Sequence, residues 1–258
     1  MQIRAWVLYC AILTPMVGLC ADPPPPPPPM DVWLGKGQLG VVDSQGNTES
    51  KSANAAIDMT RYDGSWKHAF HLDGLYGQSA GVTAAERWNA LWQSNYDINA
   101  NLFSFGELRY AHDMFSGFQY QASGSAGVGY KLINTEATKL SAQVGVGYRA
   151  LRPEDLIQNS AGQVVYRVLL PSSNSVVLSA GVDYSQALTS TTTLSNKFLL
   201  ESGSDDTLLT DALALTVKMS TSLALSLGYS LQDNTKPPAG LKKLDTVETI
   251  NLVFALKG

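Results

Sequence analysis

The chain has 258 residues, of which 45% are hydrophobic and only 16% charged, with 22 glycines and a formal net charge of −4. This composition excludes a disordered chain and a helical membrane protein, because charged residues fall below the roughly 25% usual in soluble domains while uncharged polar residues are interleaved with apolar ones. The excess of acidic residues disfavours binding to nucleic acid. We therefore expect one large all-β domain.

The first 21 residues have the pattern of a secretory signal peptide. Arg4 supplies a positive start, and residues 5–21 form an uncharged, mostly apolar stretch. Thr14-Pro15 interrupts this stretch, so it is shorter than the about 20 apolar residues that a transmembrane helix needs. We expect cleavage after Ala21. A lipoprotein processed at Cys20 is the alternative, which the bulky residue before that cysteine disfavours.

Residues 22–31 follow as a proline-rich segment. The run of prolines from Pro23 to Pro29 adopts extended polyproline II, which makes it about 22 Å long at roughly 3.1 Å per residue. We interpret it as a stiff periplasmic linker, and a docking site for a partner is the alternative. Both cysteines of the chain precede it, so we expect neither disulfides nor thiol chemistry in the mature protein.

Residues 32–258 alternate between apolar and polar side chains with period two, which predicts β-strands. Residues 223–231 are the clearest example, with leucines and one tyrosine on one face and Ala, Ser and Gly on the other. The same pattern predicts about twelve strands, with cores at 33–42, 48–62, 66–78, 85–96, 101–112, 119–131, 138–150, 176–187, 192–202, 207–219, 222–233 and 245–256.

Strand length favours a membrane barrel over a soluble sandwich. Sandwich strands usually have about 5 to 6 residues, whereas these have about 10 to 13, enough for a tilted strand to cross a bilayer. The polar faces contain mainly Gly, Ser, Gln, Asn and Thr, as the interior of such a barrel does. Two strands fit poorly: Phe103 and Phe105 lie in phase with charged residues of 101–112, and Asn196 lies in phase with apolar residues of 192–202.

Aromatic residues fall towards both ends of the predicted strands. With the amino terminus in the periplasm, the alternating strand directions predict two girdles. The periplasmic girdle contains Trp66, Tyr96, Tyr130, Tyr184 and Phe254, and the outer girdle contains Tyr76, Trp88, Tyr110, Tyr120, Tyr148 and Tyr229. The spacing of Trp66 and Tyr76 corresponds to about 25 Å of height in a tilted strand, the height of the apolar band in such barrels. Packing in a core is the alternative, favoured by Trp92 near mid-strand and Tyr62 out of phase.

The predicted connections are short on the periplasmic side. The longest ones, 151–175 and 234–244, fall on the outer side, as in outer-membrane barrels. Together these patterns predict an all-β fold, a transmembrane antiparallel up-and-down β-barrel of about 12 strands.

Short motifs at both ends of this region resemble a known family. Trp33-x-Gly35 through Leu39-Gly40 to Ser44-Gln-Gly46-Asn47-Thr48, and later Lys236-Pro-Pro-Ala-Gly240 with Lys242-Lys-Leu-Asp245-Thr246, are similar to the YdiY-like domain of unknown function, described as salt-induced outer-membrane proteins. The resemblance covers residues 32–256 and implies an outer-membrane β-barrel with no assigned chemistry. One departure is the end of the chain: Phe254 is followed by Ala255-Leu-Lys-Gly258, whereas such barrels often finish on an aromatic residue that the assembly machinery recognises.

Residues suited to catalysis or metal binding are few. His68 and His71 lie three apart on a predicted strand, so they point to opposite faces and do not share a metal ion. His112, beside Asp113, has no nucleophile motif near it, and we interpret it as a solvated loop residue. The acidic turn at 204–206 has too few carboxylates for calcium and is interpreted as a polar hairpin turn. We expect no enzymatic activity, metal or cofactor.

Charged residues in phase with the polar faces are the candidate lumen-lining residues. They are Lys36, Asp58, Asp73, Arg87, Glu107, Arg109, Lys131, Arg149, Asp183 and Lys218, with Glu201 as a further candidate. Charges of both signs can form ion pairs that plug a barrel or can line a narrow pore, and the sequence leaves both open.

The predicted function is that of an exported outer-membrane β-barrel protein of the bacterial envelope, either a narrow passive channel or a structural barrel. Expected partners are outer-membrane lipid and lipopolysaccharide, the barrel-assembly machinery during biogenesis, and small solutes or ions, but no nucleic acid. The alternative is a soluble periplasmic or secreted β-protein that binds a ligand. A lipid-modifying barrel enzyme is a remote alternative.

Overall fold

The structure is a computed structural model that describes residues 31–44, 50–114, 116–159, 164–204, 206–237 and 241–257. These residues form β1 (Trp33–Ser44), β2 (Ser50–Asp63), β3 (Trp66–Ser79), β4 (Val82–Asp97), β5 (Leu102–Asp113), β6 (Phe118–Asn134), β7 (Thr138–Gln158), β8 (Val164–Leu169), β9 (Ser173–Ala187), β10 (Thr192–Gly203), β11 (Thr207–Lys218), β12 (Leu223–Asn234) and β13 (Leu244–Lys257). The described part of the chain contains no helix long and apolar enough to span a membrane. The predicted signal peptide and almost all of the linker lie outside the described residues and stay predictions.

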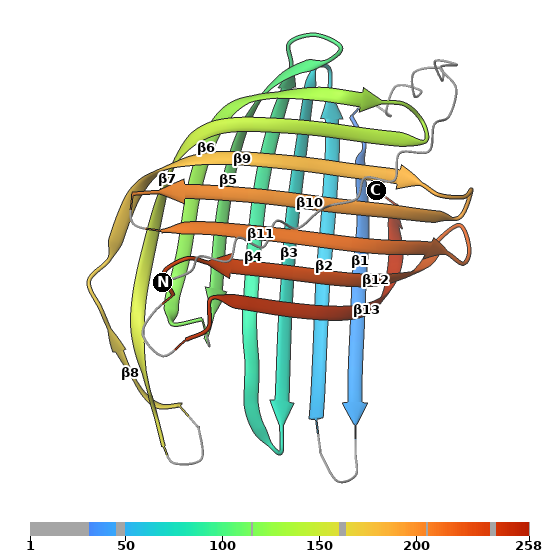
Figure 1. The fold of residues 1–258 in the computed structure, drawn as a ribbon. Coiled ribbons are helices and arrows are strands. Elements are labelled where there is room, and N and C mark those ends of the chain that lie inside the picture. The colour runs from blue at the N-terminus through green and yellow to red at the C-terminus, as the bar shows by residue number, and fades with distance from the viewer. Residues whose placement is uncertain are drawn as a thin grey trace, which may run out of the picture.

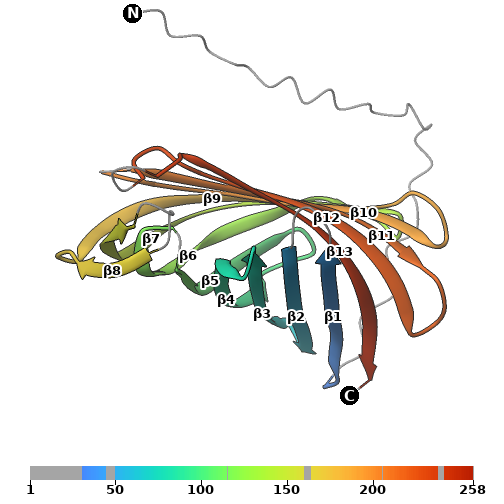
Figure 2. The ribbon, with the colours of Figure 1, turned by 90° about the horizontal axis from the view of Figure 1, so that it is seen from below.

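All the strands except β8 close into one antiparallel barrel. Successive strands pair with each other, β7 pairs with both β6 and β9, and β1 pairs with β13 to complete the ring. In Figure 1, β9 to β12 cross in front of β1 to β5, and Figure 2 shows these two walls as separate layers. Closure leaves no unpaired edge within the ring of twelve strands, and β8 alone of the described strands is an edge strand. The predicted all-β barrel of about twelve strands is confirmed.

The connection predicted at 151–175 is not a plain loop. β7 continues past Pro153 and pairs with β8, so that the two form a hairpin beyond the barrel wall. Pro153 cannot donate a hydrogen bond to the ladder, and β8 is rich in β-branched residues, which favour strand structure. Arg167 of β8 donates to the carbonyl oxygen of Met114 at 2.8 Å and pairs with Glu154 at 2.5 Å, which holds the hairpin against the barrel.

The two rims of the barrel differ in their connections. One, the short-turn rim, carries the connections 64–65, 98–101, 135–137, 188–191 and 219–222, and β1 begins and β13 ends there. The other, the long-loop rim, carries the β7–β8 hairpin and residues 235–243. It also has the two-residue turn Ala80-Gly81, where φ is 48° and 76°, as a type I′ hairpin requires. The two connections predicted to be longest therefore do lie at the same rim, opposite the short turns.

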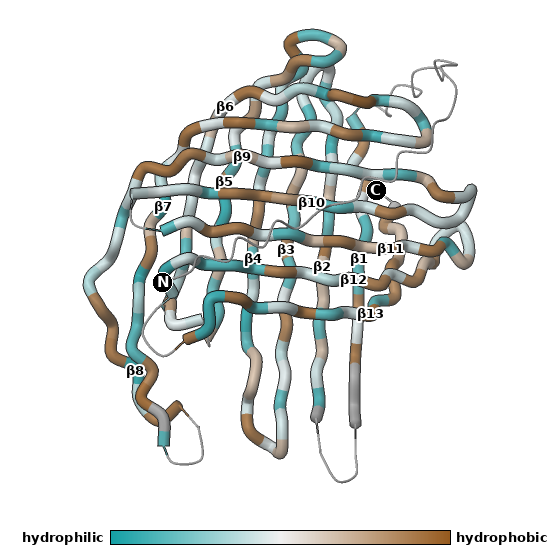
Figure 3. The backbone as a smooth tube through the Cα atoms, in the orientation of Figure 1, coloured by the Kyte–Doolittle hydropathy of each residue, from teal (hydrophilic) through white to brown (hydrophobic). Residues whose placement is uncertain are grey.

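Hydrophobic and hydrophilic residues alternate along the strands, as the colours in Figure 3 show, and successive side chains of a strand point to opposite faces of the wall. Large apolar side chains stand exposed on the outer face: Val176 is 70% and Val146 65% exposed. The buried apolar residues are fewer and belong mainly to the inner face; they are Phe103, Phe105, Phe118, Leu151, Val177, Leu199, Leu208 and Ala224. The barrel thus has its larger apolar surface on the outside, the reverse of a water-soluble domain.

Glycines shape the inner face where β6 meets β7. A Cβ atom on Gly145 would lie 2.5 Å from the carbonyl oxygen of Ala126 and 3.0 Å from the ring of Phe105. A Cβ on Gly129 would overlap the ring of Phe103. Both phenylalanines are only 4% exposed. This explains the poor fit of the strand predicted at 101–112: the two rings point inwards and occupy the space that glycines on the neighbouring strands leave free.

Candidate functional site

The lumen of the barrel is the candidate site, and the ladder register places the candidate lumen-lining residues on its inner face. These residues are Lys36, Asp58, Asp73, Arg87, Glu107, Arg109, Lys131, Arg149, Asp183, Lys218 and Glu201. Several of them pair along the wall. Lys36 Nζ lies 3.5 Å from Asp58 Oδ2, Arg109 Nη2 lies 3.0 Å from Glu107 Oε1, and Lys131 Nζ lies 2.7 Å from Asp97 Oδ2.

A polar chain centred on His71 crosses the inner faces of β2 to β4. Nδ1 of His71 lies 2.7 Å from Asp58 Oδ1, and Nε2 lies 3.1 Å from Asp73 Oδ1. Asn89 donates to the other oxygen of Asp73 at 3.0 Å. An ionised carboxylate only accepts hydrogen bonds, so both contacts of the imidazole are hydrogen bonds when each ring nitrogen carries a proton. These contacts link β2, β3 and β4, and they engage both carboxylate oxygens of Asp73 and one of Asp58.

A buried ion pair lies at the long-loop rim. The guanidinium of Arg149, which is 2% exposed, pairs with the carboxylate of Asp206 from the β10–β11 connection. Thus Asp206 of the acidic turn binds an arginine of this chain, and Asp205 lies outside the described residues. Glu201 is also 2% exposed, and no basic group of the described residues lies within ion-pair distance of its carboxylate. These acids are therefore shielded from water in the lumen.

The lumen is narrowed on the side of β4 to β7. Phe103 and Phe105 fill the inner face of β5 there, and Glu107 beside them is buried. Gln93 Nε2 on β4 donates a hydrogen bond to Gln143 Oε1 on β7 at 3.2 Å. This bond passes over the inner faces of β5 and β6. On β9 to β11, Val177, Leu199 and Leu208 are also buried on the inner face. Inward-facing lysines nevertheless stay exposed on both sides of the ring, as at Lys36 and Lys197.

Three inner-face lysines were absent from the predicted set. Lys67 lies opposite Tyr62 and Asn95, Lys139 lies opposite Ser185, and Lys197 lies opposite Asp183. All three are exposed. The sequence could have placed them there. The position number of each lysine differs by an even number from that of a predicted lumen charge on the same strand, so the two side chains share a face.

The residues of the predicted aromatic girdles lie on the outer face. Near the short-turn rim, the rings of Trp66 and Tyr96 are 5.0 Å apart between centroids. On β4 to β6, towards the long-loop rim, Trp88, Tyr110 and Tyr120 form a continuous row with spacings of 4.9 and 6.0 Å. The others, Tyr76, Tyr130, Tyr148, Tyr184, Tyr229 and Phe254, share this face, whereas Tyr62 points inwards.

The three histidines belong to β3 and β5 and lie on different faces of the wall. His68 lies on the outer face, 2.7 Å from the hydroxyl of Ser94, while His71 lies inside, so the two do occupy opposite faces. His112 is not a solvated loop residue. It belongs to β5, contacts the carbonyl oxygen of Gln119 and lies beside Trp88 on the outer face, since the regular β4–β5 pairing continues through it. Asp113 follows on the inner face.

A polar pair interrupts the apolar outer face of β10 and β11. Asn196 Nδ2 donates to Asp211 Oδ1 at 2.6 Å. In the ladder, Asn196 lies opposite Leu213, and Asp211 lies opposite Phe198, so the pair is surrounded by apolar side chains. This explains the second poorly fitting strand: Asn196 does share the outer face with apolar residues, and a partner on the next strand satisfies its amide.

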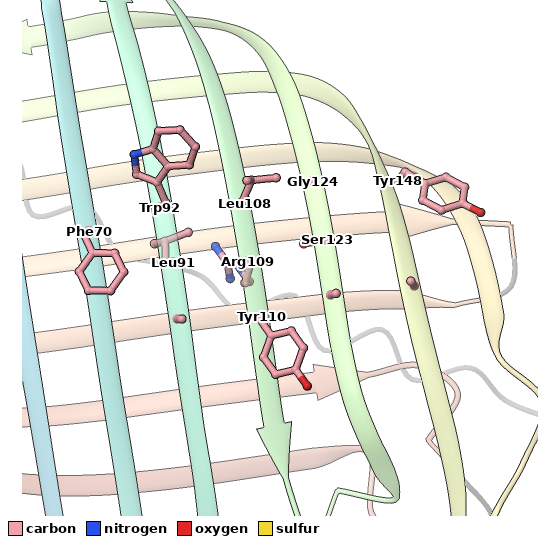
Figure 4. Close-up of a pocket in the computed structure, with 12 residues that line it drawn as sticks. Phe70, Leu91, Trp92, Leu108, Arg109, Tyr110, Ser123, Gly124 and Tyr148 are labelled. Carbon is pink, nitrogen blue, oxygen red and sulfur yellow. The ribbon is translucent and has the colours of Figure 1, made fainter.

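One surface depression lies on the outer wall of β3 to β7. It has a volume of about 460 Å³, and Figure 4 shows Trp92, Leu108, Tyr110 and Tyr148 around it. Its floor is formed by small residues such as Gly124. A hollow in this position, open and apolar, has no convergent polar groups that would orient a solute.

Comparison with known proteins places the chain in a family. A family model described as "Protein of unknown function, DUF481" matches residues 37–256. The chain belongs to this family. Membership of the DUF481 family is consistent with the YdiY-like resemblance of the sequence motifs.

Solved structures that the DUF481 chain is similar to include several barrels. The NanC porin shares 11% identity, with 87% of this chain and 100% of that chain covered and a TM-score of 0.46. The translocator domain of the autotransporter NalP from Neisseria meningitidis shares 14% identity, with coverages of 87% and 88% and a TM-score of 0.43. An outer membrane channel from Pseudomonas putida F1 shares 10% identity, with coverages of 89% and 97% and a TM-score of 0.49. A comparison with curated protein sequences gives no match.

Proposed function

We propose that this protein is an outer-membrane β-barrel whose lumen is a narrow passive channel for small solutes or ions. The observation that carries the proposal is the closed barrel with its large apolar side chains exposed on the outside. Leu178 and Leu108 are each 55% exposed, and Ile250 is 65% exposed. Such a surface is costly in water, at roughly 25 cal/mol for each Å² of apolar area, and is satisfied by lipid.

The arrangement of the outer face favours a bilayer over an aqueous compartment. Aromatic rings contact one another towards both ends of the strands, with Trp66 and Tyr96 on one side and Trp88, Tyr110 and Tyr120 on the other. Rings of this kind sit at the headgroup level of membranes. A soluble ligand-binding β-protein would instead present polar residues outwards and a more apolar interior.

The pattern of polar contacts favours a channel over a plugged structural barrel. The lumen charges pair with neighbours along the wall, as in Lys36–Asp58 and Arg109–Glu107. Among the described residues, no ion pair joins β1 to β3 with the facing strands β9 to β12. A solute can therefore pass between β1–β3 and β9–β12 without breaking an ion pair. The exposed inward-facing lysines supply a hydrated lining.

Two experiments test this proposal. The detergent-extracted protein should migrate faster on a gel before boiling than after, and it should fractionate with the outer membrane. Recovery in the soluble periplasm would contradict the membrane assignment. Purified protein added to a planar lipid bilayer should then produce discrete conductance steps. Correctly folded, inserted protein that stays silent would leave a structural barrel instead of a channel.

A further inference from the structure

Lys67, Lys139 and Lys197, called here the lumen lysines, lie between the short-turn rim and the middle of the barrel wall. Lys67 and Lys139 are each the second residue of their strands, β3 and β7, and Lys197 is near the middle of β10. All three side chains are on the inner face and are exposed. They therefore reach the space inside the barrel from three separated strands.

The lumen lysines act on the same space. The inner faces of β3, β7 and β10 all border the lumen. Lys67 and Lys197 belong to walls on opposite sides of the barrel, since β3 and β10 are separated by intervening strands in both directions around the ring. The two ammonium groups are therefore presented to the same space from different parts of the ring.

Nearby acids do not neutralise this charge. Among the described residues, no carboxylate oxygen lies within 4.0 Å of the amino group of any lumen lysine. Asp97 is already paired with Lys131, and Asp58 with Lys36 and His71. Asp183, which lies opposite Lys197 in the ladder, is one acid beside three lysines. The inner face near the short-turn rim therefore carries a net positive charge exposed to water.

Acidic residues towards the long-loop rim do not offset this charge along the water-filled path. Glu107, Glu201 and Asp206 are buried, at 7%, 2% and 8% exposure. Asp113 and Asp245 also lie on the inner face at that rim, where Arg87 lies opposite Asp113 in the ladder and Lys242 belongs to the adjoining connection. Ion preference in a narrow pore follows the charges that line its aqueous path, because the low-dielectric wall concentrates their field there.

We propose that the lumen lysines form an anion-attracting site inside the barrel, so that small anions enter and cross the channel in preference to cations. This inference rests on the proposed channel function and specifies its solute class. The ammonium groups attract an anion as hydrated point charges and make no bidentate contact, so selectivity among small anions is weak. Exchange with bulk solution stays fast for the same reason, as a conducting site requires.

The test is the ion selectivity of the full-length protein in a planar bilayer that separates two KCl concentrations. The chloride-to-potassium permeability ratio of the wild type should exceed one. In the triple variant K67Q/K139Q/K197Q the ratio should fall by about threefold or more, the effect expected from three charges within about one Debye length of the ion path. The matched control K51Q/K236Q/K243Q removes the same charge from the outer face of β2 and from the connection 235–243, and should leave the ratio close to that of the wild type.

Two outcomes overturn the inference while leaving the channel intact: a wild-type ratio of one or less, or a triple variant whose ratio matches that of the control. Absence of conductance steps in inserted wild-type protein refutes the channel itself, and the two failures are thus distinguishable. Heat-modifiable migration verifies that each variant is folded. If the triple variant does not fold, Lys67→Gln alone should lower the ratio in the same direction, and an unchanged ratio would count against the proposal.

Discussion

Phe105→Ala tests the interpretation that inward-facing rings narrow the lumen. Phe105 is 4% exposed and packs against the inner face of β7, where a Cβ on Gly145 would come within 3.0 Å of its ring. Replacing it with alanine removes the ring from both the packed side of the barrel and the space beside the pore. The change should destabilise the barrel and widen its passage at the same time.

The size of the effect follows from burial. Phe→Ala at a fully buried site costs about 3 to 5 kcal/mol, and Phe105 should approach this value because glycines around it have no side chains with which to fill the cavity. The matched control is Phe70→Ala on the outer face, where the residue is 37% exposed. Lipid can refill the space left there, so the loss at Phe70 should be smaller by about 2 kcal/mol.

Urea unfolding of the barrel in phospholipid vesicles measures the first quantity, and single-channel conductance measures the second. Phe105→Ala should lower the free energy of unfolding more than Phe70→Ala and should raise the conductance. Equal stability losses in the two variants, or an unchanged conductance in folded Phe105→Ala protein, would refute the proposed role of the ring.

Three further predictions concern other parts of the wall. Arg149→Met leaves Asp206 buried without its partner and should destabilise the barrel by about 3 to 5 kcal/mol in the same unfolding assay. The double variant N196L/D211L removes a polar pair from the apolar outer face and should raise the free energy of unfolding in vesicles by about 1 to 3 kcal/mol. Gly145→Val places atoms against the backbone of β6 and the ring of Phe105, and it should reduce the yield of folded, heat-modifiable barrel.

Matched changes elsewhere provide the controls. Arg61→Met breaks the exposed pair with Asp31 and should cost less than about 1 kcal/mol, so a similar loss at Arg149 would contradict the burial argument. Gly106→Val meets open space, with no atom within 4 Å of the added Cβ, and should fold normally. If Asn196→Leu alone raises the free energy of unfolding as much as the double variant does, then the Asp211 carboxylate does not destabilise the outer face of the barrel.

Period-two alternation was sufficient to predict the barrel because it is a local property of each strand. In residues 223–231 the side chains at odd positions face outwards and those at even positions inwards, as the register with β11 shows. The same parity rule would have found Lys67, Lys139 and Lys197. The lumen lysines share parity with predicted lumen charges on their own strands, yet their mutual proximity depends on which strands face each other across the ring.

Features that depend on distant packing could not be predicted from alternation. Phe103 and Phe105 looked out of phase because the glycines that accommodate them belong to neighbouring strands. The partner of Arg149 comes from a turn 57 residues later in the chain, and only the closed sheet brings the two together. The β7–β8 hairpin was missed because its strands leave the barrel and carry no transmembrane-length pattern.

The measurement that tests the central claim most directly is electrical recording from purified protein inserted into a planar phospholipid bilayer. A barrel with lipid on its outer face and a hydrated passage between its walls should give discrete conductance steps that scale with salt concentration. Protein that inserts and resists unfolding at room temperature, but gives no steps at any salt concentration, would contradict the channel function proposed here.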